Sequence, residues 1–237
     1  MAAAYQNKSV AEQNSVDLAW QALMSSEFEA LRACIFSDIA ELRRFRQLLV
    51  NSVIATDIFD KELATARKAR WDKAFSEEFQ EGSRVAINRK ATIVIEHLIQ
   101  ASDVAHTMQH WHVYTKWNER LFQEMYEAYQ TGRWDKDPSA GWYEGEIGFL
   151  DNYVIPLAKK LKNCGVFGVA SDEYLNYAQQ NRREWEARGK EIVATFVERH
   201  AKKERAAVQA AEEVVSKEAA TPEAKTAEET ENAESKE

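Results

Sequence analysis

The sequence predicts an all-α fold, and three observations support this fold class. Glycine and proline are scarce, with 8 and 3 residues among 237, and neither occurs before Gly82. Leu, Ala, Glu, Lys, Arg and Gln dominate the N-terminal part, and these residues favour helices. No segment has the alternating pattern of a β-strand. Because 45% of the residues are hydrophobic, the chain is long and apolar enough to bury one sizeable core.

The first part of the chain is expected to form three helical segments. They lie at residues 15–24, at residues 27–76 with one candidate break near Ser37-Asp38, and at residues 88–107 after a loop at Gly82-Ser83. In the second segment an inward face is formed by apolar residues and one threonine at helix-compatible spacing, namely Leu42, Phe45, Leu49, Val53 and Thr56.

The second part of the chain continues the helical pattern. We expect helices at residues 110–129, at residues 146–161 with a kink at Pro156, and from residue 171 onward. The last helix begins at Ser171-Asp172-Glu173, where the serine is a candidate N-cap and the acids suit the first turn.

The C-terminal end has a different composition. Residues 216–237 contain seven Glu, three Lys and no aromatic residue. Such a segment cannot bury enough apolar surface to fold, so we expect a disordered acidic tail. The predicted organisation is a helical domain at residues 1–200, a helix extension at 201–215 and the tail at 216–237.

Composition also limits the class of protein. The net charge of −8 argues against nonspecific nucleic-acid binding. No apolar run approaches the roughly 18 residues that span a bilayer, and no signal-peptide pattern is found. Cys34 and Cys164 fit no metal or redox spacing and are expected to be buried thiols. We therefore expect a cytoplasmic protein without a membrane segment.

Asp103 is the first candidate functional residue. At helical spacing it follows Ile95 and Ile99, so its carboxylate is expected to project from an apolar stripe. Burying an ionised carboxylate is costly unless a cation or several donors meet it. The residues leave two readings open, a ligand of a divalent metal or a buried salt bridge to Arg or Lys.

Three further groups of residues are candidates. Thr56 and Asp57 end an apolar helix face and suggest either a polar cleft shared with Asp103 or hydrogen bonding between helices, which we favour from the residues alone. His106 and His110 have the spacing of a zinc-binding pair, but core or exposed histidines are commoner. Trp117, Phe149 and Glu146 could contact a planar ligand, although such aromatic residues usually belong to a core.

Together these segments resemble the class I 3′,5′-cyclic-nucleotide phosphodiesterases, an all-helical metallohydrolase family. The order and spacing match over roughly residues 5–200. The resemblance is carried by five runs, Ser9–Glu12, Val53–Asp57, Gln100–Asp103, Tyr114–Arg120 and Glu146–Leu157.

The resemblance implies a role for each matching residue. Asp103 would bind the catalytic metal, and Glu12, Thr56 and Asp57 would form the outer shell around a second metal. Substrate contacts would come from Phe149, which clamps the purine, from Glu146 at the position of a purine-reading glutamine, and from His106 and Trp117. The reaction implied is hydrolysis of cAMP or cGMP to the 5′-monophosphate in signal transduction, with Zn and Mg or Mn and a metal-bridged hydroxide.

The sequence departs from the family pattern in three ways. The His-Asp metal motif and the histidine general acid are expected upstream of this chain, so no catalytic residue is assigned and three of four direct metal ligands are missing. Asn14-Ser15 replaces a pair of histidines. Glu146, when ionised, can only accept hydrogen bonds, so the purine preference stays open.

We therefore expect the C-terminal part of a phosphodiesterase catalytic domain that lacks its N-terminal helices. It would bind a cyclic nucleotide but show little activity alone, and its parent protein could be tethered to a membrane. The alternative is a non-catalytic helical pseudoenzyme or interaction module, which could associate with a full-length phosphodiesterase.

Overall fold

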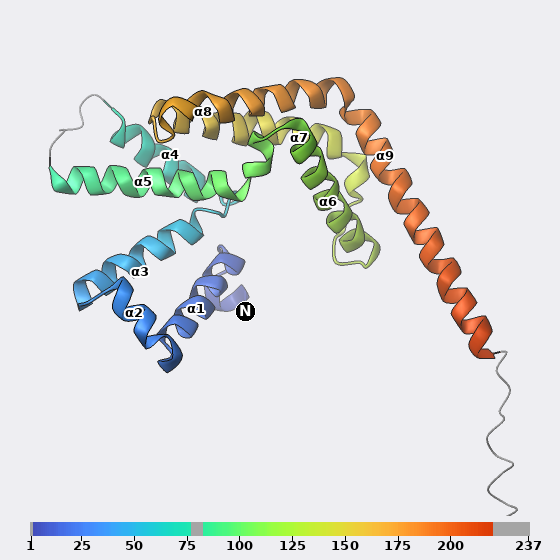
Figure 1. The fold of residues 1–237 in the computed structure, drawn as a ribbon, viewed down its shortest axis with the longest axis horizontal. Helices are drawn as coiled ribbons and strands as arrows, with labels where there is room; N and C mark the ends of the chain where they lie inside the picture. The colour runs from blue at the N-terminus through green and yellow to red at the C-terminus, as the bar shows by residue number, and fades with distance from the viewer. Residues whose placement is uncertain (1, 77–82, 220–237) are drawn as a thin grey trace, which may run out of the picture. The chain divides into compact units, whose positions relative to one another are not determined.

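The computed structural model describes residues 2–76 and 83–219, and within these residues the fold is all-α without strands (Figure 1). This confirms the predicted fold class. The α-helices are Val10–Met24 (α1), Glu29–Ile35 (α2), Ile39–Ile54 (α3), Lys61–Ala74 (α4), Arg84–Asp103 (α5), Trp111–Gln130 (α6), Trp142–Phe149 (α7), Ile155–Asn163 (α8) and Ser171–Ala219 (α9).

Short helical turns connect several of these helices. Five are 3₁₀-helical, and one, which joins α7 to α8, is π-helical. They are Ala2–Tyr5 (η1), Ser26–Phe28 (η2), Ala105–Met108 (η3), Pro138–Ala140 (η4), Leu150–Val154 (η5, the π turn) and Gly168–Ala170 (η6).

The predicted long helix at residues 27–76 is three helices. The break near Asp38 is confirmed, because its side chain caps α3 by accepting a hydrogen bond from the Glu41 amide. A second break at residues 55–60 was not predicted. There the Asp60 side chain caps α4 by accepting a hydrogen bond from the Leu63 amide. Each of the two breaks is thus followed by a helix that begins at an aspartate N-cap, Asp38 for α3 and Asp60 for α4.

The buried face of α5 differs from the predicted one. Its buried residues are Ile93, Glu96, His97, Gln100 and Ala101. Asp103 is exposed and Ile95 is 37% exposed, so the expectation of a buried Asp103 carboxylate is wrong. Residues 95, 99 and 103 therefore lie on a face of α5 that is adjacent to the buried face and more exposed than it.

The C-terminal helices follow the prediction more closely. Helix α6 matches its expected range, whereas the helix expected at 146 begins earlier, at Trp142. The π turn η5 ends just before Pro156, where the kink was expected. Helix α9 begins at Ser171, but Ser171 is itself helical and its hydroxyl has no partner among the described residues.

The predicted acidic tail can be compared with the structure only in part. Helix α9 continues through residues 216–219, which the sequence prediction placed in the tail. Residues 220–237 lie outside the described residues.

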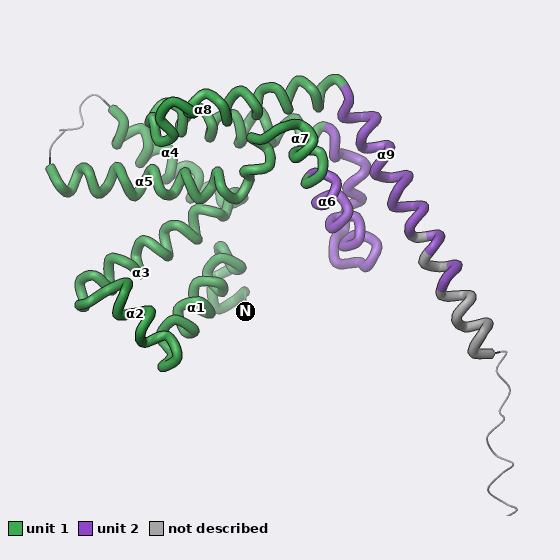
Figure 2. Tube along the Cα trace, in the orientation of Figure 1, with its two compact units in different colours: residues 1–117, 144–187 green, residues 118–143, 188–237 purple. Residues whose placement is uncertain are grey.

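The chain divides into two compact units (Figure 2). Unit 1 comprises residues 1–117 and 144–187. Its core contains Tyr114 and Trp185, both 0% exposed, with ring centroids 5.8 Å apart in an edge-on arrangement. A second cluster in unit 1 joins Trp71, Ala74 and Ile93.

Unit 2 comprises residues 118–143 and 188–237. Its core is built around Phe122, which is 0% exposed and meets Trp142 edge-on at 5.2 Å. Phe196 of α9 packs on the same ring at 5.5 Å.

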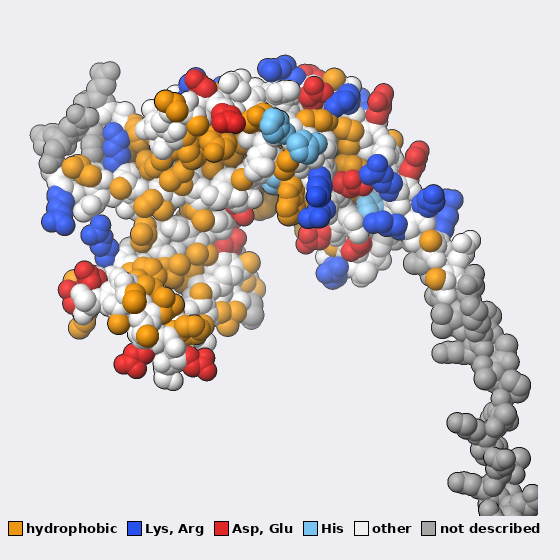
Figure 3. Space-filling model, viewed as in Figure 1, with side chains coloured by type: hydrophobic (Ala, Val, Ile, Leu, Met, Phe, Trp, Pro, Cys, Tyr) orange, Lys and Arg blue, Asp and Glu red, His pale blue; other side chains and the backbone are white. Residues whose placement is uncertain are grey.

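Hydrophobic side chains also lie on the surface over α1–α3 (Figure 3). The exposed ones there are Leu18, Met24, Phe28, Leu31, Ile35 and Ile39. Cys34 of α2 is exposed and Cys164 is half-buried, so the expectation of two buried thiols is wrong for Cys34. In the part of the chain that is described, no helix has the length and apolarity to cross a bilayer.

Candidate functional site

All the candidate residues belong to unit 1, so their surroundings can be described within one compact body. They come from α1, from the turn between α3 and α4, and from the segments α5, η3, α6 and α7. In chain order they are Glu12, Thr56, Asp57, Asp103, His106, Trp117, Glu146 and Phe149.

Asp57 organises the turn between α3 and α4. Its Oδ2 accepts a hydrogen bond from the Ser9 hydroxyl at 2.7 Å. Its Oδ1 accepts from the backbone amides of Phe59 at 3.0 Å and Asp60 at 3.1 Å. Three donors therefore fix the carboxylate, and Ser9 ties the start of α1, three residues before Glu12, to this turn.

Gln100 connects this turn to the helix that carries Asp103. Its side-chain amide donates to the carbonyl of Ala55 at 3.0 Å, and Gln100 is 5% exposed. Ala55 directly precedes Thr56, whose hydroxyl donates to the Val53 carbonyl at 2.7 Å. The Thr56–Asp57 turn and the last turn of α5 are thus held together by a buried hydrogen bond.

Arg67 of α4 lies behind the same turn. It is 6% exposed, and its Nη2 donates to the backbone carbonyl of Asp57 at 3.0 Å. Burial lowers the pKa of Arg67, while Tyr153, Glu96 and Asp57 oppose that change. The guanidinium therefore lies in a polar environment shared by the α3–α4 turn, α5 and η5.

The charge of Asp103 acts on two ring side chains, His106 and Tyr153. Burial lowers the pKa of His106, and the nearby Asp103 carboxylate opposes this. Burial raises the pKa of Tyr153 to about 12, with Asp103 acting in the same direction and Arg67 against it. His106 in turn lies beside Trp117, with ring centroids 6.3 Å apart.

Phe149 stacks on Tyr153, whose pKa is also affected by the charge of Asp103. The Phe149 and Tyr153 rings are stacked, with centroids 5.4 Å apart and an interplanar angle of 17°. Phe149 is half-buried, so part of its ring stays accessible to a planar ligand. The structure thus contains two ring pairs, His106–Trp117 and Phe149–Tyr153, and the charge of Asp103 acts on one ring of each pair.

Glu146 is fixed by a core residue. The Tyr114 hydroxyl donates to its Oε2 at 2.7 Å. Burial raises the pKa of Glu146 to about 7, and the hydrogen bond from Tyr114 acts against this rise. Near neutral pH a substantial fraction of Glu146 is therefore protonated, and a protonated carboxyl group can donate a hydrogen bond as well as accept one. This relaxes the acceptor-only limit expected from the sequence.

The fit of these residues to a metal was tested on their positions. No group of three or more His, Cys, Asp and Glu side chains comes together within residues 2–76 and 83–219. Asp103 is the one candidate direct ligand, and His110 is engaged with Tyr177 at 3.0 Å. The described residues therefore do not form a complete metal site.

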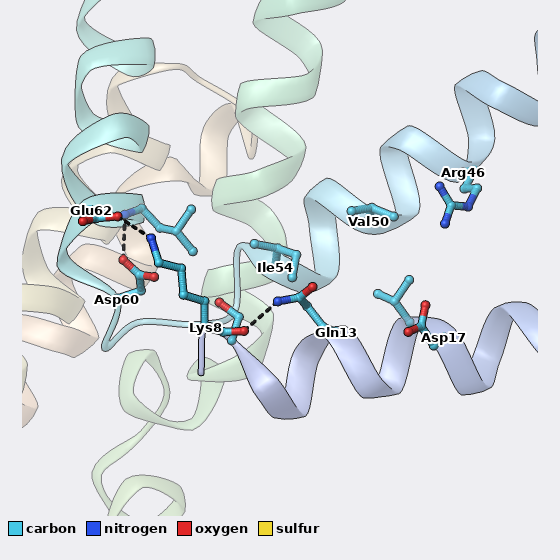
Figure 4. A pocket seen from close by; sticks show the side chains of 11 residues that line it. Lys8, Gln13, Asp17, Arg46, Val50, Ile54, Asp60 and Glu62 are labelled. Carbon is cyan, nitrogen blue, oxygen red and sulfur yellow. Dashed lines mark hydrogen bonds and ion pairs between the residues drawn. The ribbon is translucent and has the colours of Figure 1, made fainter. Parts of the chain in front are cut away.

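A cavity of about 410 Å³ lies between α1, α3 and the start of α4 (Figure 4). Two of its charged residues are paired with each other. Lys8 forms an ion pair with Glu62 at 2.8 Å, and the Gln13 side chain donates to the Lys8 carbonyl at 2.6 Å. None of the eight candidate residues lines this cavity.

The sequence did not predict the side chains that contact the candidate residues and hold them in place. Tyr114 and Tyr153 have the spacing of ordinary core aromatics, and nothing near Arg67 in the sequence marks a buried arginine. Only Gln100 had a signal, a polar residue one turn before Asp103 on the helix.

Solved structures share this fold. The phosphodiesterase domain of the RhoPDE fusion protein from the choanoflagellate Salpingoeca rosetta superposes with a TM-score of 0.60 at 20% identity, over 84% of this chain and 61% of that one. The structure of LmjPDEB1 in complex with IBMX gives a TM-score of 0.62 at 20% identity, over 78% and 55%. The fold is therefore that of an all-α phosphodiesterase domain.

The sequence matches the 3′5′-cyclic nucleotide phosphodiesterase family over residues 1–166, and the chain belongs to this family. A relative is the probable 3′,5′-cyclic phosphodiesterase pde-3 of Caenorhabditis elegans, 23% identical over 195 residues. That match covers 76% of this chain and 27% of the relative. The chain thus spans about a quarter of that relative and about 55–61% of the solved domains.

Proposed function

We propose that this chain forms the nucleotide-recognising part of a cyclic-nucleotide phosphodiesterase domain. The substrate would be cAMP or cGMP, and the complete domain would hydrolyse it to the 5′-monophosphate in signal transduction. In this proposal residues 1–200 belong to the domain, residues 201–215 extend its last helix and residues 216–237 form the acidic tail.

The observation that carries the proposal is the arrangement of Glu146 and Phe149. Tyr114 holds the Glu146 carboxyl group at 2.7 Å, and Phe149 follows it by three residues on the same helix. A fixed polar group beside a half-buried ring can read the edge of a purine that stacks on the ring. His106 and Trp117 would complete the contacts, since both lie on the segment that follows Asp103.

The proposal assigns this chain only part of the metal site. Asp103 would ligate the catalytic divalent ion, and Glu12, Thr56 and Asp57 would form the outer shell around a second one, the two ions being Zn and Mg or Mn. Because the described residues do not complete such a site, we assign no catalytic step to this chain by itself. One exposed carboxylate holds a divalent ion weakly against water, and we expect little or no turnover from the isolated chain.

Calorimetry with the purified chain tests the recognition. Wild type should bind cAMP or cGMP, and Phe149→Ala should weaken binding by about tenfold, as expected for one lost base–aromatic stack. Phe167→Ala, which removes a ring that packs in a tilted arrangement on Tyr174 elsewhere in unit 1, is the matched control and should leave binding unchanged. Equal losses in the two variants would contradict the assignment of Phe149.

A turnover assay with Mg²⁺, Mn²⁺ or Zn²⁺ and both cyclic nucleotides tests the inactivity. Robust metal-dependent hydrolysis by the isolated chain would contradict it. Loss of that activity in Asp103→Asn would then assign the metal to Asp103.

A non-catalytic interaction module is the second candidate. The observation that favours it is the lack of a metal-ligating cluster in the described ranges. The partner would be a full-length phosphodiesterase. Sedimentation of the two proteins together, and turnover of the full-length enzyme with and without this chain, would distinguish the candidates.

A further inference from the structure

A second cavity of unit 1 lies next to the α3–α4 turn. It has a volume of about 220 Å³ and lies between α3, α4 and α5. Its walls include the apolar side chains of Val50, Ile54 and Leu63 and three charged residues, Arg67, Arg70 and Glu96. None of the eight candidate nucleotide or metal residues lines it.

One wall of this cavity carries an unsatisfied acceptor. Glu96 is 2% exposed, and its Oε2 pairs with Arg70 Nη2 at 2.6 Å. Its Oε1 is buried and has no hydrogen-bond partner among the described residues. A buried carboxylate oxygen without a donor costs free energy, so a donor from a ligand would be favourable there.

The neighbouring wall carries a donor with spare capacity. Arg67 is 6% exposed, and its Nη2 donates to the neutral backbone carbonyl of Asp57. Among the described residues, no carboxylate lies within ion-pair distance of its guanidinium. A guanidinium has five N–H groups, so Arg67 can also donate to an acceptor placed in the cavity.

We propose that this cavity binds a small neutral molecule with a primary amide or lactam edge on a short branched apolar body. The amide N–H donates to Glu96 Oε1, the amide carbonyl accepts from Arg67, and the apolar body packs on Val50, Ile54 and Leu63. A neutral edge meets both charged walls without the desolvation cost of a second ion. The proposal does not rest on the proposed function, although Arg67 also donates to Asp57 of the α3–α4 turn.

Three probes with the same isobutyl body test the proposal by ¹H–¹⁵N NMR titration of the full chain. Isovaleramide offers a donor and an acceptor, isovalerate offers acceptors alone, and isoamylamine offers donors alone. Isovaleramide should shift resonances of the cavity walls and saturate, and the other two should bind at least about fivefold more weakly. Tightest binding of isovalerate, equal binding of all three probes or no saturable shift would each overturn the proposal.

Two variants and a control locate the binding. Glu96→Leu should weaken isovaleramide binding by about tenfold, equivalent to about 1.4 kcal/mol for one hydrogen bond to a charged group. Ala66→Phe should abolish binding without unfolding the protein, because Ala66 lines the cavity at an exposed position of α4. Asp72→Asn, an exposed acid on α4 outside the cavity, should bind like wild type.

The Ala66→Phe variant keeps the test decisive if Glu96→Leu fails to fold. Far-UV circular dichroism establishes that each variant keeps its helices. Wild-type affinity in a folded Ala66→Phe variant would overturn the proposal.

Discussion

Glu96 and Glu146 are two glutamates of unit 1 that are withdrawn from water in different surroundings. Glu96 on α5 pairs with the cationic Arg70 at 2.6 Å, and Arg67 lies close by. Glu146 on α7 has a neutral partner, the Tyr114 hydroxyl, at 2.7 Å. Burial raises the pKa of both carboxyl groups, but only Glu96 has cations that oppose the rise by their charge.

The charge of the partner decides which of the two glutamates changes its protonation state near neutral pH. A counter-charge compensates a buried carboxylate, whereas a single neutral hydrogen bond leaves most of the desolvation penalty in place. Glu146, with a pKa of about 7, is therefore the group whose charge changes near neutral pH. Four changes test this comparison, and they are ordered by expected effect.

Replacing Glu146 should have the largest effect on the pH dependence of stability. Its pKa is about 7 in the folded chain and 4.5 in the reference state, so the folded state binds more protons between these values. Stability is then lost as pH rises from 4.5 through 7, by about 3 kcal/mol for a shift of this size. Glu146→Gln should remove that loss in urea unfolding curves measured from pH 4.5 to 8. An unchanged pH profile would contradict the raised pKa.

His97, the residue after Glu96, should give a dependence of opposite sign. Burial lowers its pKa from 6.5 to about 4, so the unfolded chain binds more protons between these values. Stability is lost as pH falls from 6.5 through 4, and His97→Leu should remove about 3 kcal/mol of this pH dependence. The packing lost in the variant lowers stability equally at every pH and does not change the slope. The same unfolding series from pH 4 to 7 measures it. Persistence of the acid loss in the variant would assign it to another group.

Removing the cation beside Glu96 should destabilise the fold at neutral pH. Arg70→Met leaves a buried carboxylate without its ion-pair partner and should cost about 2 kcal/mol, less than a fully buried pair because Arg70 is half-exposed. Lys68→Met on the same helix breaks the exposed pair with Asp72 and should cost under about 0.5 kcal/mol. Thermal unfolding at pH 7 measures both variants, and equal costs would contradict the comparison.

Removing the hydroxyl beside Glu146 should have the smallest effect on stability among the four changes, controls aside, and a clear effect on the titration of Glu146. Tyr114→Phe removes a hydrogen bond worth about 1 kcal/mol. Because that bond lowers the Glu146 pKa, the variant should titrate above the wild-type value of about 7. Carboxyl ¹³C NMR of Glu146 measures the midpoint. A midpoint that falls in the variant would mean that Tyr114 does not stabilise the ionised form.

The fold was predictable where helices end at strong local signals. The scarcity of Gly and Pro predicted the fold class, and Asp38 marked a real break. The break at residues 55–60 was missed although Asp60 caps α4 as Asp38 caps α3, because the helix-compatible apolar spacing continues up to Thr56 and masks the break.

The candidate site was less predictable, because its supports are contacts between distant segments. Asp103 was expected to be buried from the stripe of Ile95 and Ile99, but packing selected the neighbouring face of α5. The bond from Gln100 to Ala55 spans 45 residues, and that between Tyr114 and Glu146 spans 32. Local pattern carries no information about such pairs, so the roles assigned to the candidate residues stay predictions.

The π turn at Leu150–Val154 has a consequence for how this part of the chain tolerates length changes. A π turn accommodates an extra residue within a continuous helix, and each residue of an α-helix turns the side chains by about 100°. Deleting one residue from this turn would restore regular winding and rotate Glu146 and Phe149 relative to Leu157 and Leu161, the buried side chains of α8. The number of residues in the π turn therefore sets the direction in which Glu146 and Phe149, the proposed recognition residues, point.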